Sequence, residues 1–387
     1  MREVVVCAAV RSAVGRSGRG SLKDTRPDEL LGQVMKGLLA RVPGLDPALL
    51  GDVVMGSAMP EAEQGMNVAR IAGFLAGLPD SVPAVTINRF CSSGLQSIAQ
   101  ASAAIAAGWQ DIAMAGGVES MSQIAMGGQK ISPHPGLMGV RPEAYTPMGI
   151  TAENVATRFS VSRADQDAFA YASHQKAIRA IAEGRFVDEI VPIHTRVMTD
   201  GGWKDLTFAV DEGPRADTSL EGLAKLKAAF KQDGTATAGN SSQTSDGAAA
   251  VIVASRDVAE TLGLPILGVL RAYQVAGVPP EIMGIGPVAA IPKALEKAGI
   301  RLSDVDLFEL NEAFAAQAVY CVRELGIDPA KVNVNGGAIA LGHPLGCTGA
   351  KLTATLLHEM GRRGSRYGVV SMCIGGGMGA AAVFERA

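Results

Sequence analysis

Two stretches far apart in the chain repeat the same order of predicted strands, helices and glycine-rich turns. Runs that alternate or are uniformly apolar predict strands, and apolar residues recurring every three to four positions predict helices. The first stretch predicts strands at 52–56, 85–87 and 111–115, a helix around 68–75 and a second helix that ends at Gly108. The second predicts strands at 306–310, 332–334 and 367–371, a helix over 314–325 and another helix after the turn at 336–349. A glycine cluster closes each stretch, at 116–117 and 375–377. This repetition indicates an α/β fold made of two duplicated halves.

The region between the two stretches has a different composition. Methionine, proline and glycine are frequent there and strand-like runs are scarce. One helix is predicted at 163–183, with Ser162 and Asp165 as its capping box and Gly184 as its stop. We expect an inserted loop domain at 119–243 that covers the site. The N-terminal half then comprises 1–118 and continues over 244–267, which contains a buried strand at 248–253. The C-terminal half comprises 268–387.

Charge and cysteine usage narrow the class of partner. The net charge is −3 and the basic residues are scattered, which argues against a nucleic-acid surface. No run reaches the ~18 apolar residues of a membrane span, and the N-terminal apolar run is too short for a signal peptide. The five cysteines lie far apart without a C-x-x-C pair. We therefore expect a small-molecule substrate, no disulfide, no metal site and a cytoplasmic location.

Cys91 lies between a predicted strand and a predicted helix, in the stretch VTINRFCSSGLQS. Unpaired N–H groups and the positive end of the helix dipole favour a thiolate at such a position. Cys91 is therefore a candidate nucleophile. A small buried apolar side chain is the alternative that the position leaves open.

His343 is the candidate base among five histidines. It lies in the glycine-rich turn ALGHPLGCTG, directly before a predicted helix. If the halves are duplicated, this turn is the counterpart of the Cys91 turn, and the two meet across a pseudo-twofold axis. By contrast, His174 falls inside a helix and His358 near a helix C-terminus.

Cys373 is the third candidate, where a strand runs into SMCIGGGMG. The backbone N–H groups of these glycines can form an oxyanion hole. The alternative is a cysteine of the β-core. A dinucleotide fingerprint starting at Gly375 is rejected, because only seven residues follow Ala380. Core positions are expected for Cys7 and Cys321, and a helix start for Cys347.

Four blocks together resemble the signatures of the thiolase family: NRFCSSGLQS (88–97), LNEAFAAQ (310–317), NGGAIALGHPLGCTGA (335–350) and CIGGGMGAA (373–381). PMGITAENVA (147–156) and TAGNSSQTSDGAAA (237–250) extend the resemblance over essentially the whole chain. It implies the thiolase fold, with two βαβαβαββ halves in a five-layered α-β-α-β-α arrangement and an inserted loop domain. It also implies a homodimer or homotetramer.

The resemblance further implies an acyltransferase that cleaves 3-ketoacyl-CoA with CoA, as in fatty acid β-oxidation, or runs the reverse Claisen condensation. Cys91 is then the nucleophile and His343 its activating base, while Cys373 is the second acid/base. Asn311 is expected to hold a water that completes one oxyanion hole with His343. The N–H groups of Cys91 and Gly375 form the other hole.

Contacts to the substrate are implied in the same way. Arg215 and Ser242 match positions that touch the adenosine end and the pantetheine of CoA. Met148, Ala313 and Phe314 match the apolar wall near the reactive end. CoA is a substrate here, and no cofactor is expected. Without the family, Arg215 is an ordinary solvated surface charge.

Three other functions compete with this prediction. A decarboxylating ketosynthase shares the fold class, but histidines take the place of the second cysteine. A non-catalytic lipid carrier has no need of the four site residues. Thiolases specialised for acetoacetyl-CoA typically carry a histidine directly before the Met-Gly of the 147–156 block, where this chain has Pro147. Pro147 therefore favours a 3-ketoacyl-CoA thiolase that accepts medium chains.

Overall fold

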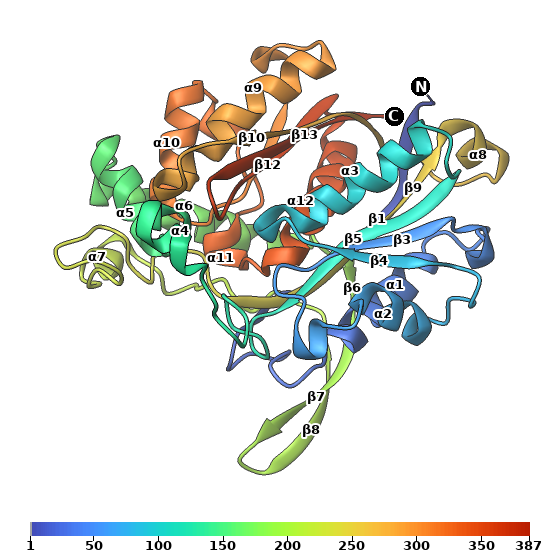
Figure 1. The fold of residues 1–387 in the computed structure, drawn as a ribbon, viewed down its shortest axis with the longest axis horizontal. Helices are drawn as coiled ribbons and strands as arrows, with labels where there is room; N and C mark the ends of the chain where they lie inside the picture. Colours follow the sequence, from blue (N-terminus) through green and yellow to red (C-terminus); the bar gives the residue numbers. More distant parts are fainter. Residues whose placement is uncertain (1) are drawn as a thin grey trace.

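The computed structural model describes residues 2–387 and shows a large mixed sheet with helices on both sides and through its middle (Figure 1). The main path of the sheet runs β11-β12-β13-β10-β1-β9-β5-β3-β4, with β2 paired to β9 and β6 to β1. The N-terminal half contributes β1 (Val4–Ser12), β2 (Gly15–Arg16), β3 (Asp52–Gly56), β4 (Ala84–Ile87), β5 (Ile112–Ser120) and β9 (Ser245–Ser255). The C-terminal half contributes β10 (Gly268–Gly277), β11 (Leu307–Leu310), β12 (Tyr367–Ile374) and β13 (Met378–Arg386), and β6 (Ile190–Val191) comes from the inserted region. The two half-sheets join edge to edge, because β1 pairs with β10.

Helices occupy three layers around these half-sheets. Those outside the N-terminal half are α1 (Pro27–Leu39) and α2 (Val68–Ala76), and those outside the C-terminal half are α9 (Gly286–Ala298) and α10 (Ala315–Leu325). Between the half-sheets lie α3 (Ser93–Ala106) and α12 (Leu345–Arg363), while α8 (Arg256–Thr261) follows β9. The result is the predicted α-β-α-β-α arrangement of two similar halves.

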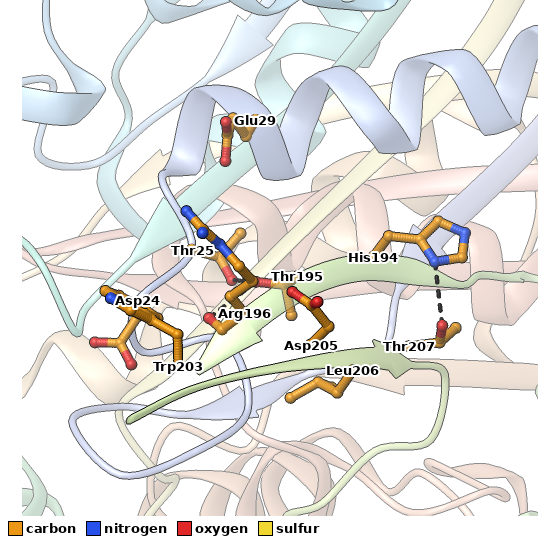
Figure 2. A pocket seen from close by; sticks show the side chains of 10 residues that line it. All are labelled: Asp24, Thr25, Glu29, His194, Thr195, Arg196, Trp203, Asp205, Leu206 and Thr207. Atoms are coloured by element: carbon orange, nitrogen blue, oxygen red, sulfur yellow. Dashed lines mark hydrogen bonds between the residues drawn. The ribbon is translucent and has the colours of Figure 1, made fainter. Parts of the chain in front are cut away.

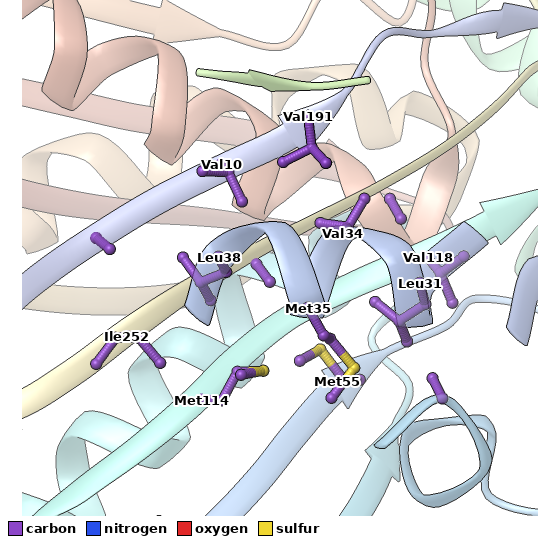
Figure 3. Packing of buried hydrophobic residues seen from close by; sticks show 14 of the residues in the cluster. Val10, Leu31, Val34, Met35, Leu38, Met55, Met114, Val118, Val191 and Ile252 are labelled. Carbon is purple, nitrogen blue, oxygen red and sulfur yellow. The ribbon is translucent and has the colours of Figure 1, made fainter. Parts of the chain in front are cut away.

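Alternation along the strands produces the two separate cores. In β1, Val5 and Val10 pack in the outer cluster with α1, whereas Val4 and Val6 pack in the central cluster with α3 and α12. Side chains of a strand point alternately to its two faces, so a strand covered on both faces is apolar throughout. Figure 3 shows the outer cluster, in which Leu31, Val34, Met35 and Leu38 of α1 face the strands.

Two glycines allow the central helices to touch. A Cβ atom on Gly94 of α3 would lie 2.8 Å from the backbone nitrogen of Ala350, and one on Gly349 of α12 would lie 2.2 Å from that of Leu95. No side chain fits at such distances, so both positions require glycine. This close crossing brings the starts of α3 and α12 together, and with them the turns that carry Cys91 and His343.

The inserted region holds α4 (Pro135–Val140), α5 (Met148–Arg158), α6 (Arg163–Ala182) and α7 (Leu220–Ala224). At the start of α6, Ser162 Oγ accepts the backbone N–H of Asp165, which is one half of the predicted capping box; Asp165 Oδ2 accepts from Ser162 Oγ and not from the backbone N–H of Ser162. The expectation of few strands was wrong at one place, because β7 (Ile193–Thr199) and β8 (Gly202–Phe208) form a hairpin that protrudes from the body (Figure 1). Its loop is the dipeptide Asp200-Gly201, a strong hairpin signal.

Two local predictions in the C-terminal half also differ from the structure. Residues 332–334 form only an isolated bridge, between Val332 and Phe308. The Asn333 side chain takes the place of a strand partner, because it bonds both the N–H and the C=O of Leu310 at 2.8 Å. The turn predicted to reach Gly349 ends earlier: it contains α11 (Ala338–Leu341), and α12 begins at Leu345.

Within residues 2–387 no helix has the length and apolarity to cross a bilayer.

Candidate active site

Cys91 occupies a single-turn 3-10 helix, η3 (Phe90–Ser92), between β4 and α3. The turn is held by its own polar groups: Asn88 Oδ1 accepts the N–H of Phe90 at 2.7 Å, and Ser93 Oγ donates to the Phe90 carbonyl at 2.7 Å. Phe90 has φ of 44°, a left-handed conformation that is uncommon for a bulky residue. The residue before the cysteine is therefore strained, and its neighbours fix it.

Two backbone N–H groups, those of Gly375 and of Cys91 itself, lie near the Cys91 sulfur and favour its thiolate form. The side chain is 8% exposed and packs in a cluster with Leu345, in the first turn of α12. Burial raises the pKa of the Cys91 thiol to about 11, and the two N–H groups offset only part of this effect. The helix-start expectation of a thiolate is thus corrected: in the free protein Cys91 carries its proton.

His343 lies directly before α12, and both of its ring nitrogens have partners. Nδ1 lies 2.6 Å from Thr348 Oγ1, and Nε2 lies 3.3 Å from Asn311 Nδ2. Its backbone N–H donates to the carbonyl of Gln243 and to Ser245 Oγ. Burial, followed by the charge of Lys351, lowers the pKa of His343 to about 3, so the ring is neutral. A neutral imidazole can accept a proton, as a general base must.

Asn311 follows β11, and its backbone N–H donates to the carbonyl of Ser371 in β12 at 2.9 Å. Its side-chain Oδ1 is buried and has no hydrogen-bond partner among the described residues. Buried polar atoms are nearly always paired in folded proteins. The free Oδ1, beside the Asn311–His343 contact, therefore marks a position for a water or a substrate group.

Cys373 is fully buried in β12, in a cluster with Ala313, Phe314 and the partly buried Met148. Burial, and then the proximity of Cys91, raise the pKa of the Cys373 thiol well above its usual value. The turn η3, which carries Cys91, contacts β12, so the two thiols lie in the same region of the site. A Cβ atom on Gly375 would lie 3.5 Å from Met148 Sδ, so the methionine borders the same space.

A cavity of about 220 Å³ lies beside this centre, lined by residues of the inserted region and of α11. Arg215 stands exposed at the cavity, and its backbone N–H donates to His174 Nδ1. Gln243 lines the cavity, and its carbonyl accepts the N–H of His343. Gln243 thus joins the wall of this cavity to the backbone of His343, and Arg215 lies in the same wall. Ser242 is half-buried nearby, and its N–H donates to Ala313.

A larger cavity, of about 560 Å³, lies where the β7–β8 hairpin leaves the body (Figure 2). Its lining is mostly polar and includes Asp24, Glu29, Asp205 and the indole of Trp203. None of the predicted site residues lines it. Size alone would select this cavity, but Arg215, a predicted site residue, lines the smaller one, and Gln243 in the wall of the smaller cavity bonds His343.

Several residues of the centre were missed from the sequence. Thr348 and Ser245 bond His343, and Gln243 links it to the cavity. Glu119 is buried and accepts hydrogen bonds from Gln64 Nε2 and from three backbone N–H groups, those of Ala58, Met59 and Gly346. A readable signal existed only for Thr348, whose position four residues after Pro344 places it one turn above the histidine.

Comparison with known proteins gives consistent findings over the whole chain. Residues 4–257 match the family model "Thiolase, N-terminal domain", and residues 264–386 match "Thiolase, C-terminal domain". The chain is 56% identical to the 3-ketoacyl-CoA thiolase of Bacillus subtilis (strain 168), covering 100% of both chains. It is 57% identical to the peroxisomal 3-ketoacyl-CoA thiolase of Homo sapiens, over 99% of this chain and 91% of that one.

Two solved structures have closely similar folds. The dimeric peroxisomal thiolase of Saccharomyces cerevisiae superposes with a TM-score of 0.91 at 46% identity, covering 100% of this chain and 98% of that one. The acetyl-CoA acetyltransferase of Bacillus anthracis also gives 0.91, at 43% identity, over 100% and 99%.

Proposed function

This chain belongs to the thiolase family, and we infer that it is an acetyl-CoA C-acyltransferase that cleaves 3-ketoacyl-CoA with CoA to acetyl-CoA and a shortened acyl-CoA. The observation that carries this function is the meeting of two thiols. Cys91 from the N-terminal half and Cys373 from the C-terminal half lie on two elements in contact, η3 and β12, and the N–H of Gly375 favours the Cys91 thiolate.

In the first half-reaction Cys91 attacks the 3-keto carbon. His343 Nε2 takes the thiol proton, the sulfur bonds to C3, and the C2–C3 bond breaks. The electron pair of that bond leaves on C2 as the enolate of acetyl-CoA. The Cys373 thiol gives C2 its proton, and acetyl-CoA departs. An acyl group remains on Cys91.

In the second half-reaction CoA removes this acyl group. The Cys373 thiolate takes the proton of the CoA thiol, and the CoA sulfur attacks the thioester carbonyl. When the acyl–sulfur bond of Cys91 breaks, the His343 imidazolium returns the proton. Both acid/base groups are thereby restored to their starting states.

Negative charge develops on two oxygens during the reaction, that of the acyl carbon and that of the thioester enolate. Hydrogen-bond donors are proposed for each of these oxygens. The N–H groups of Cys91 and Gly375, which both lie near the sulfur, are placed to stabilise the oxyanion formed on the acyl carbon. His343 and a water at Asn311 serve the thioester enolate, a role supported by the unpartnered Oδ1. Removing a single oxyanion donor typically costs about 10²–10³ in kcat.

The cavity at Arg215 is the proposed CoA site. The exposed guanidinium suits the phosphates or the adenosine end, and Ser242 is placed for the pantetheine. Met148, Ala313 and Phe314 form the apolar wall beside Cys373. We propose that the reaction uses no cofactor or metal ion, since two thiols, one imidazole, backbone N–H groups and a water at Asn311 supply every proton and oxyanion donor that it needs.

A homodimer is the proposed assembly, with a tetramer as the further possibility. β4 ends the sheet as an unpaired edge, and apolar side chains stand exposed around it: Val85, Met66, Phe74 and Phe90, at 36%, 91%, 47% and 38%. Edges and patches of this kind are normally covered.

A cytoplasmic location is supported by five cysteines that are all free thiols.

A chain-length series of thiolysis tests this function. We expect CoA-dependent loss of 3-ketoacyl-CoA, with kcat/KM rising several-fold from C4 to C8, since each buried methylene contributes up to ~0.8 kcal/mol. Pro147 is the N-cap residue of α5, directly before Met148, and brings no imidazole into this wall. Activity confined to C4 returns the chain to the acetoacetyl-CoA class, and activity with neither substrate points to a carrier.

A further inference from the structure

We propose that Thr348 is a positioning residue that holds His343 in the tautomer with its proton on Nδ1. Nε2 then carries the lone pair, which contacts Asn311 in the resting site and accepts the proton of Cys91 during the reaction. This inference rests on the proposed function and deepens it, because it names the group that prepares the base.

The hydroxyl of Thr348 has one proton, and it donates that proton in a hydrogen bond to a backbone carbonyl. Thr348 lies in the first helical turn of α12, and its Oγ1 donates to the carbonyl of Pro344 at 2.8 Å. The same oxygen lies 2.6 Å from His343 Nδ1. A hydroxyl with its only proton elsewhere can offer just a lone pair, so the proton between the two atoms belongs to Nδ1.

The other ring nitrogen gives a second, independent indication. Asn311 Nδ2 lies 3.3 Å from His343 Nε2, and an amide NH₂ group is a donor only. Nε2 must therefore present its lone pair. Two contacts, from α12 and from the residue after β11, select the same tautomer.

Water is also excluded from the contact between Thr348 and His343. The Thr348 side chain is fully buried and His343 is 4% exposed, so bulk water does not replace the hydroxyl. Many enzymes hold a catalytic histidine with a carboxylate, which also stabilises the imidazolium. A hydroxyl fixes the tautomer without adding a negative charge. The imidazolium formed in the first half-reaction then readily returns its proton in the second.

Three variants test the role. Thr348→Val keeps the shape and removes the lone pair, whereas Thr348→Ser keeps the hydroxyl. Thr353→Val is the matched control, because Thr353 is equally buried in α12 and makes the same bond to the carbonyl four residues earlier, with no imidazole in contact. A wrong histidine tautomer can cost up to ~10⁴ in kcat.

We expect Thr348→Val to lower kcat for thiolysis by about 10²–10³ with the KM for CoA within about threefold. Thr348→Ser and Thr353→Val should stay within about threefold of the parent in both constants. Thr348→Val at parental kcat, or Thr353→Val as slow as Thr348→Val, would overturn the proposal.

Nitrogen NMR of the parent protein labelled with ¹⁵N-histidine measures the tautomer directly. The His343 signals are identified by their loss in His343→Asn. A protonated Nδ1 and a bare Nε2 are expected, and the reverse pattern refutes the inference even if Thr348→Val does not fold. This spectrum does not depend on turnover, so it also separates a failure here from an absence of thiolysis.

Discussion

Replacing Cys373 by serine should separate the two chemical tasks of the site. The substitution leaves Cys91 and His343 in place, so transfer of an acetyl group from acetyl-CoA to Cys91 should persist. Removal of a proton from the acetyl Cα should stop, because a serine hydroxyl is far more basic as an anion than a thiolate and cannot hold the negative charge. Such general acid–base steps contribute about 10²–10⁴ in rate, or roughly 3–5 kcal/mol.

The structural cost of this change is smaller than the catalytic one. Cys373 is fully buried among apolar neighbours, and an unpaired hydroxyl there costs about 1–3 kcal/mol. Domains of this kind have about 5–15 kcal/mol of stability, so the variant should fold. Cys321→Ser is the matched control. Cys321 is also fully buried, and burial raises the pKa of its thiol to about 12, but it packs in α10 away from Cys91.

Two measurements on each variant decide the question. Intact-protein mass spectrometry reports acetylation of Cys91 by acetyl-CoA, and deuterium uptake from D₂O reports exchange at the acetyl Cα. We expect Cys373→Ser to be acetylated but to exchange at least about 10²-fold more slowly, and Cys321→Ser to behave as the parent in both. Exchange at the parental rate in Cys373→Ser would remove Cys373 from the mechanism.

Two further predictions follow from single residues. One equivalent of iodoacetamide should inactivate the enzyme at Cys91, because Cys91 is the most exposed of the five cysteines and the pKa of its thiol, about 11, is below the value of about 12 for Cys347 and Cys321. Prior acetylation by acetyl-CoA should protect it; peptide mapping that places the inactivating label on Cys347 or Cys321 would contradict this. Burial raises the pKa of Glu359, but bonds from Arg363, Asn335 and Arg362 lower it to about 2 overall, below the ordinary 4.5. A lowered pKa stabilises the fold above pH 4.5, and this stability is lost as the pH falls towards 2. Glu359→Gln should therefore flatten the fall in urea-unfolding free energy across that window by about 2 kcal/mol, after discounting for the partly exposed arginines; an unchanged slope would refute it.

Local sequence patterns predicted most elements of the fold, and physical reasons explain the exceptions. The strands of the Asp200-Gly201 hairpin alternate only weakly, because Ile193 and Phe208 are their only buried residues and most of the others are polar. Residues 332–334 are apolar enough for a strand, but Asn333 replaces strand pairing with side-chain bonds to a residue that is distant in the sequence. Contacts of that kind depend on tertiary structure.

The candidate site shows the same division between local and tertiary information. The turns of Cys91 and His343 could be located from glycines and helix starts alone. Their protonation could not, because the helix-start argument for Cys91 treats the thiol as if it faced solvent. In the folded chain the crossing of α3 and α12 buries it, and burial outweighs the helix end. Thr348 acts only through His343, so its spacing after Pro344 is the one signal of its role in the sequence.

Burial gives the resting site a common property that shapes its chemistry. It raises the pKa of both thiols and lowers that of His343, so all three groups are neutral near pH 7. A separate step that moved the Cys91 proton to His343 would create two charges in a low-dielectric space, which is costly. The N–H of Gly375 offsets this for the sulfur, and the carbonyl of a bound substrate can accept the charge as soon as it forms. Proton transfer should therefore accompany the attack of the sulfur. A solvent isotope effect on the acylation of Cys91 then distinguishes this course from a preformed ion pair.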